Sequence, residues 1–159
     1  MADNMQLMYA RSAYHTLCKA LDNVGWNYQR KDDEFKIMFG VNGDDIPMNF
    51  LVIVDAERQL IRLLSLLPFQ MNEDKRIEGA VATCAINYLL ADGSFDFDIE
   101  EGHVMFRMTN TFRGSIIGEE LVNHMVSVAC FTVDKYNDML SALNDGSISL
   151  SDFIQSLND

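Results

Sequence analysis

The sequence has few of the residues from which catalytic thiols, metal sites and cross-links are built. Its 159 residues include three cysteines, Cys18, Cys84 and Cys130, which lie far apart and form no CxxC pair. An odd count with this spacing indicates neither a disulfide framework nor a zinc site. We expect all three to be buried, reduced thiols on apolar helix faces, where free cysteine usually sits.

Long apolar runs are missing as well. The longest, 50–54 and 63–69, are far shorter than the roughly 20 residues that a membrane-spanning helix needs. The N-terminus has no basic region followed by an apolar one, so no signal peptide is predicted. We therefore expect a cytoplasmic protein without a membrane partner.

Basic residues are scarce. The chain has 12 Lys and Arg against 24 Asp and Glu, a formal net charge of −12 at pH 7. Without a local basic stripe, such a surface repels a polyphosphate, which argues against a nucleic-acid partner. The same charge suits a basic or amphipathic peptide, so a protein or peptide partner is the expectation that remains.

The motifs of the common enzyme classes are absent from the sequence. There is no GxSxG elbow, no GxGxxG turn and no GxxxxGK phosphate loop. The histidines His15, His103 and His124 fall on three different predicted elements, so the local sequence sets none of them beside a nucleophile. We expect no catalytic residues, no enzymatic activity and no cofactor.

Two stretches carry enough oxygen atoms to be weighed as metal sites. In 92–101 the acidic residues alternate with phenylalanines, which is the pattern of a strand with one solvated and one buried face. The tail 144–153 has the glycine and the final acid of a calcium loop. However, Ser141 and Leu143 then fall where oxygen-rich ligands are needed. We interpret the tail as a helix stop followed by a Ser-capped helix, and expect no metal site.

Hydrophobic periodicity predicts the order of the elements. Apolar residues recur at helical spacing in some segments and alternate with polar residues in others. The predicted elements are a helix over 5–24, strands over 34–41, 48–54 and 59–66, a helix over 72–92, a hairpin over 94–108, a long helix over 118–143 and a short helix over 150–157. No linker or internal repeat interrupts them, so we expect a single domain over 1–159.

Particular residues set the expected ends of these elements. Gly25 stands where a left-handed C-cap residue is expected. Pro68 is expected to end the third strand, and Asn72 to be the N-cap of the second helix. The apolar stripe of that second helix consists of Ile77, Val81, Cys84, Ala85 and Tyr88.

The long helix over 118–143 is apolar nearly all round its middle. Val122, Val126, Phe131 and Val133 widen its apolar surface beyond what one packed face needs. Such a helix is either packed on both sides or shared with a second subunit. We take these four residues as a candidate interaction surface, with a homodimer through the second or third helix as one expectation.

This order of elements resembles the YbjN family within the type III secretion chaperone-like fold. The resemblance rests on the first helix ending in Val24-Gly25 and on the segments FKIMFGV, MNFLVIVD, INYLLADG and GSFDFDIEEGHVMFRMT. It spans nearly the whole chain and lies in pattern and order. It implies an α+β fold in which helices pack on an antiparallel sheet. The family is described as bacterial sensory transduction regulators, without known enzymatic activity or catalytic residues to carry across.

Two functions are therefore expected. The first is a non-enzymatic regulatory or protein-interaction module. The alternative is a type III secretion-type chaperone that binds an extended, amphipathic segment of another protein. A small enzyme or ligand-binding protein would need a concave pocket with convergent polar groups, and a sequence alone does not display one.

Overall fold

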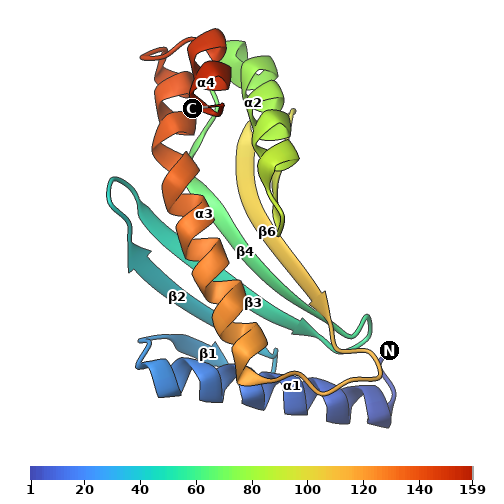
Figure 1. The fold of residues 1–159 in the computed structure, drawn as a ribbon. Helices are drawn as coiled ribbons and strands as arrows, with labels where there is room; N and C mark the ends of the chain where they lie inside the picture. The colour runs from blue at the N-terminus through green and yellow to red at the C-terminus, as the bar shows by residue number, and fades with distance from the viewer. Residues whose placement is uncertain (159) are drawn as a thin grey trace.

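The computed structural model describes residues 1–158 and arranges them as a curved sheet with helices on one face (Figure 1). The elements are α1 (Asn4–Val24), β1 (Gln29–Lys31), β2 (Lys36–Asn42), β3 (Pro47–Asp55), β4 (Leu60–Gln70), the single turn η1 (Glu73–Lys75), α2 (Arg76–Leu89), β5 (Ser94–Phe97), β6 (His103–Thr111), α3 (Glu119–Asp145) and α4 (Leu150–Ser156). The predicted α+β order is confirmed, with β1 and η1 added to it.

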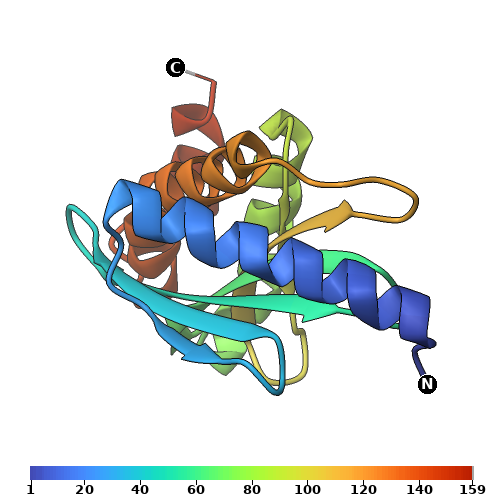
Figure 2. The ribbon, with the colours of Figure 1, turned by 90° about the horizontal axis from the view of Figure 1, so that it is seen from below.

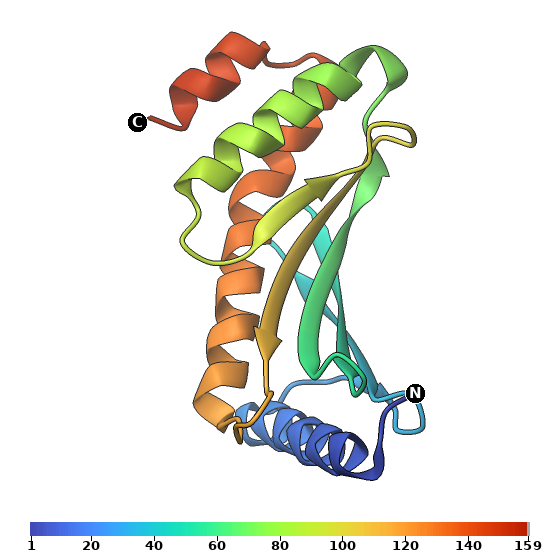
Figure 3. The same cartoon turned by 90° about the vertical axis from the view of Figure 1, so that its right-hand side faces the viewer.

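The six strands join in one antiparallel sheet of order β1-β2-β3-β4-β6-β5. Buried residues alternate along the strands, and Phe39, Phe50 and Phe106 are among those that form the core. The rings of Phe39 and Phe50 stack with their centroids 5.1 Å apart. Figure 3 shows α2 and α3 on one side of the sheet, whereas no helix of residues 1–158 covers the opposite face.

The helix α3 holds the layers together. It contacts α1, α2 and α4 as well as strands β3, β4 and β6. Its residues Ala129, Val133, Leu140 and Leu143 have no exposed surface. Figure 2 shows α1 at the end of the molecule where α3 begins. The long helix is therefore packed on several sides, one of the two arrangements that its apolar composition predicted.

Ionic and hydrogen-bond contacts tie α1 to the short strand β1. The Tyr14 hydroxyl of α1 donates to Asp32 Oδ1 at 2.8 Å, and Arg30 Nε donates to the same oxygen at 2.6 Å. Both bonds lower the pKa of the Asp32 carboxyl, and the bond from Arg30 has the larger effect. At the end of α1, Gly25 has the left-handed conformation that its position predicted, with φ of 83°.

The connection from β4 to α2 differs from prediction. β4 does not end at Pro68 but runs on to Gln70, and its pairing with β6 changes register between Leu66 and Gln70. Proline lacks an N–H and is tolerated in such an irregular stretch. Asn72 precedes η1 and makes no side-chain cap. Its Nδ2 donates instead to the carbonyl oxygen of Asn144 at 3.1 Å.

The apolar stripe of α2 points away from the core, contrary to prediction. Ile77 is 69% exposed and Tyr88 is 90% exposed, and Cys84 is exposed as well. The residues that α2 buries are Gly79, Ala82, Thr83 and Ile86. Small residues allow the helix to approach β5 closely, so the contact with the sheet needs little apolar volume. Of the three cysteines, only Cys18 is buried as expected.

Within residues 1–158, no helix combines the length and the hydropathy that crossing a membrane requires.

Candidate functional site

The structure places the four predicted interface residues of α3 in two environments. Val122, Val126 and Val133 are at most 4% exposed, whereas Phe131 is 70% exposed. The first three pack into the core because α3 meets both the sheet and other helices. Their assignment to an accessible surface is wrong for this fold, and a contact through Phe131 stays a prediction.

The acidic residues around the β5–β6 hairpin bind to their own neighbours. Asp96 forms a bidentate pair with Arg107, at 2.6 and 2.9 Å, and this pairing raises the pKa of the arginine. Asp98 accepts hydrogen bonds from the N–H groups of Glu100 and Glu101 at 3.0 and 3.1 Å. Among residues 1–158, no three acidic, histidine or cysteine side chains gather into a group that could hold a metal ion.

The histidines belong to separate surroundings. His124 Nε2 lies 2.8 Å from an Asp92 carboxylate oxygen, and His103 Nε2 lies 3.0 Å from Gln70 Nε2. His15 is exposed on α1. None of the three is hydrogen-bonded to a serine or cysteine in the part of the chain that the structure describes.

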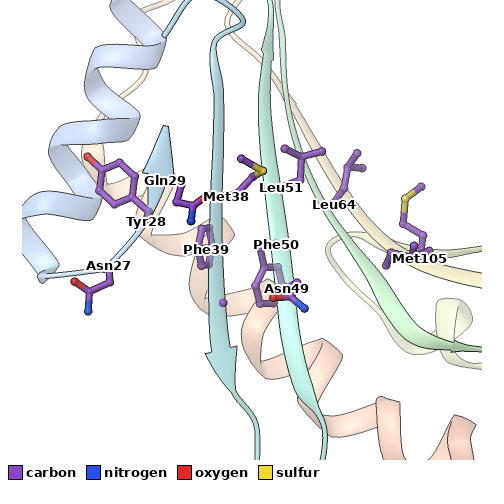
Figure 4. Close-up of a pocket in the computed structure, with 12 residues that line it drawn as sticks. Asn27, Tyr28, Gln29, Met38, Phe39, Asn49, Phe50, Leu51, Leu64 and Met105 are labelled. Carbon is purple, nitrogen blue, oxygen red and sulfur yellow. The ribbon is translucent and has the colours of Figure 1, made fainter. Parts of the chain in front are cut away.

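The open face of the sheet is apolar where a solvated face is expected to be polar. Met38 of β2 pairs with Leu51 of β3, and Leu51 pairs with Leu64 of β4, so a row of apolar side chains crosses three strands. Figure 4 shows this row continuing to Met105 of β6. These residues, with Leu66, form the floor of an open groove of about 650 Å³, which we call the sheet groove.

The rim of the sheet groove is polar and carries almost no charge. Amide side chains line it, from Asn27 before β1, from Gln29 of β1 and from Asn49 of β3. The nearest arginine on β6, Arg107, is already held by Asp96. The groove therefore offers apolar contact with a few amide hydrogen bonds and no charged anchor.

No side chain that lines the groove is suited to acid–base or nucleophilic chemistry. Tyr28 is its one titratable member, and the Tyr28 hydroxyl donates to Asp22 Oδ1 at 2.7 Å. Burial raises the pKa of Tyr28 well above its ordinary value, and this hydrogen bond adds a smaller increase. The groove therefore supplies apolar contacts and amide groups.

One edge of the sheet is left unpaired beside the groove. The Val54 N–H donates to the carbonyl of Phe35 at 3.0 Å, which fixes the alternation of hydrogen bonds between β2 and β3. By that alternation, the backbone groups of Gly40 and Asn42 point away from β3. On that side β1 pairs only with residues 36–38 of β2. The outward backbone groups of Gly40 and Asn42 therefore have no strand partner among residues 1–158, and Gly40 lines the groove.

The sequence carries a signal for this open apolar face. Residues 48–54 are apolar on both sides of the strand, which predicts a central strand. β3 is indeed central in the sheet, but no described helix covers its second side. The sequence pattern alone does not distinguish a strand covered on both faces from one whose apolar outer face is open.

A comparison with known protein families identifies the family of this chain. The model of the YbjN family, described as "Putative bacterial sensory transduction regulator", matches residues 14–142. The chain belongs to the YbjN family. The YbjN match begins within α1 and ends within α3, so it leaves α4 outside. No curated protein matches the sequence.

Solved structures share this fold at low identity. The crystal structure of YbjN from E. coli, described as "a putative transcription regulator", is similar with a TM-score of 0.58 and 12% identity, over 81% of this chain and 89% of that one. A chain of the HopA1-SchA chaperone-effector complex is similar with a TM-score of 0.54 and 12% identity, over 79% of this chain and 93% of that one. The type III chaperone-like fold is thus confirmed, and neither comparison describes an enzyme.

Proposed function

We propose that this YbjN-family protein is a non-enzymatic regulatory module whose sheet groove binds an extended segment of a partner protein. One observation carries the proposal: the apolar open face of the sheet runs up to an unpaired strand edge at Gly40 and Asn42. A strand added there gains backbone hydrogen bonds from β2. The side chain opposite Gly40 meets no side chain of β2, so it has room to enter the groove.

The groove and the overall charge together specify the chemistry of that segment. Every second residue should be apolar, because alternate side chains of an added strand face the groove floor. The residues between them should be basic, because the protein carries a net charge of −12. Met38 and Met105 supply flexible apolar contacts that adapt to different side chains.

The likeness to the chaperone-effector complex favours a second candidate, a secretion-type chaperone with the same groove. Both functions use an extended segment, but they differ in the state of the bound protein. A chaperone holds its client unfolded along a long stretch, whereas a regulator engages one segment of a partner that stays folded. Hydrogen exchange of the partner in the complex separates them, since only a chaperone would leave the partner broadly unprotected.

A binding experiment with defined peptides tests the groove. The probe is a short, fluorescently labelled peptide in which Leu and Lys alternate, and the control peptide has the same composition in a helical, non-alternating order. Fluorescence anisotropy should detect binding of the alternating peptide and weaker binding of the control. Equal binding of the two peptides would mean that charge alone drives association, and would overturn the proposal.

Substitution in the groove gives the matching protein control. Leu64→Gln removes one apolar side chain from the floor and should weaken binding of the alternating peptide by about tenfold, given what one buried leucine contributes. Ile99→Gln changes a residue that is 47% exposed outside the groove and should leave binding unchanged. An unchanged affinity in Leu64→Gln would place the peptide elsewhere.

The proposal also covers the domain organisation, the location and the oligomeric state of the protein. We infer that residues 1–159 form a single domain, since one hydrophobic core connects residues from Ala10 to Phe153. We infer a cytoplasmic location from membership in a family of regulators, which cell fractionation tests. We further infer that the chain forms a homodimer.

A further inference from the structure

The outward stripe of α2 joins with α4 to form a second apolar surface. Figure 3 shows α4 beside α2, at the end of the molecule away from α1. Phe153 of α4 is fully buried, whereas Ile154 and Leu157 are only partly buried. Between the two helices lies an open hollow of about 470 Å³, whose lining includes Val81, Cys84, Tyr88 and Leu89 of α2 and the side chains of Ile154 and Leu157. We call this hollow and the α2 stripe around it the α2–α4 face.

Only the α4 part of this face lies outside the residues that the family model matches. The YbjN match ends at residue 142, and α4 begins at Leu150. Ile154 and Leu157, on one wall of the hollow, therefore come from a segment that the family model does not include, whereas the α2 wall lies within the match.

The α2 part of the α2–α4 face is nearly free of charge in a strongly acidic protein. Between Ile77 and Ala91 the only ionisable carboxylate is Glu78, and it is paired with Lys75 at 3.0 Å. A basic partner would find little electrostatic attraction here. A second copy of the chain, with its own net charge of −12, meets little repulsion along this stripe of α2.

The face also carries a projection and a hollow side by side. Tyr88 is 90% exposed, projects from α2 and lines the hollow with part of its surface. In a two-fold dimer the same patch meets itself, so a projection beside a hollow is self-complementary. Ile77, Val81, Tyr88 and Leu89 of α2 are between 44% and 90% exposed. Together these side chains expose on the order of 500 Å² of mostly apolar surface, as much as the largest patch on a typical monomer. With the polar rim, this approaches the roughly 800 Å² per partner of a stable interface.

We propose that the α2–α4 face docks a second copy of the chain about a two-fold axis, with each Tyr88 entering the hollow of the other copy. This rests on the homodimer part of the proposed function and is independent of the sheet groove. The groove lies on the opposite face of the sheet from α2, so both surfaces are usable at once. If the peptides fail to bind the groove, the dimer prediction stands unchanged.

Light scattering coupled to size exclusion, over a concentration series, tests the dimer. The full-length chain should be a dimer at micromolar concentration. Tyr88→Glu should make it a monomer, with dimerisation weakened about 100-fold or more, because a central interface residue gains an unpaired charge. The control is Phe131→Glu, which places the same charge on α3 at a residue that is 70% exposed. Both positions are exposed in the monomer, and circular dichroism checks that both variants fold.

Each alternative outcome overturns the proposal. A wild-type protein that stays monomeric throughout the series shows that the face does not self-associate. Dissociation by Phe131→Glu with a stable dimer in Tyr88→Glu would assign the interface to α3 instead.

The exposed thiol on this face gives an independent readout. Cys18 is buried, and Cys130→Ser leaves Cys84 as the accessible cysteine. In that background, the rate of maleimide labelling at Cys84 should fall as protein concentration rises, because dimerisation covers the thiol. Adding Tyr88→Glu should abolish this dependence. A labelling rate that ignores concentration while the protein dimerises would show that the dimer forms through another surface.

Discussion

A buried serine on the inner face of the sheet should destabilise the native protein. Ser65 of β4 is 1% exposed and pairs with Phe106 of β6, and its neighbours on the same face are Leu63 and Leu67. Its hydroxyl has no hydrogen-bond partner among the described residues. Because water solvates this hydroxyl in the unfolded chain, the unpaired burial favours unfolding.

The size of the effect follows from two opposing terms. Burying a hydroxyl without a partner costs about 1–3 kcal/mol. Ser65→Ala removes that cost at nearly constant volume, while alanine is less favourable in a strand by a few tenths of a kcal/mol. The desolvation term wins, so the substitution should raise the free energy of unfolding by about 1 kcal/mol. For a chain of this size, that corresponds to a rise in Tm of about 2–4 °C.

Thermal and urea unfolding followed by circular dichroism measure this change. The comparison variant is Thr83→Val in α2, where a buried hydroxyl does have acceptors, donating to the carbonyls of Gly79 and Ala80 at 3.0 Å each. Thr83→Val should lower stability by about 1 kcal/mol, opposite in sign to Ser65→Ala. If Ser65→Ala is destabilising instead, its hydroxyl is hydrogen-bonded in solution and the reasoning fails.

Three further predictions concern single residues. Gly93→Ala should cost about 2 kcal/mol or more in urea unfolding, since φ is +73° and the new Cβ would clash with the Phe106 ring. A neutral result would contradict this tight approach. Phe153→Ala should cost about 3–5 kcal/mol, because the ring is fully buried; a loss below 1 kcal/mol would mean that α4 is not docked. Asp32→Asn should destabilise most near neutral pH, because the Arg30 hydrogen bond depresses the pKa of Asp32 below its ordinary 3.8. That contribution is present above about pH 4 and fades as pH falls through the folded pKa, so the two stability–pH curves should converge in acid.

The elements that the sequence predicted best are those whose signals are local. The end of α1 depends on Gly25, whose left-handed φ follows from its place after the last periodic residue. The β5–β6 hairpin depends on alternation over a few residues, and Phe95 is buried as predicted. Helix α4 starts at a Ser149 side chain that accepts from the Asp152 N–H, as its cap position predicts.

The errors concern what each face meets, which depends on distant parts of the chain. Periodicity predicted which residues of α2 form an apolar stripe, but not that the stripe points outward. The helix packs through its small residue Gly79, which lies close to Phe97 of β5. Val122 was assigned to a surface because the number of helices and strands around α3 is not encoded locally. The sheet groove was not predicted for the same reason. A strand that is apolar on both sides has the same sequence pattern whether its outer face is covered or open.

The central claim, that an extended segment adds to the edge of β2 over the sheet groove, is tested most directly by amide hydrogen exchange. The N–H groups of Gly40 and Asn42 should exchange fast in the free protein, because β1 does not reach them. With the alternating Leu-Lys peptide at saturation, their exchange should slow together, because each becomes bonded to the added strand. Tight peptide binding that leaves both amides fast would contradict strand addition and the role assigned to this face.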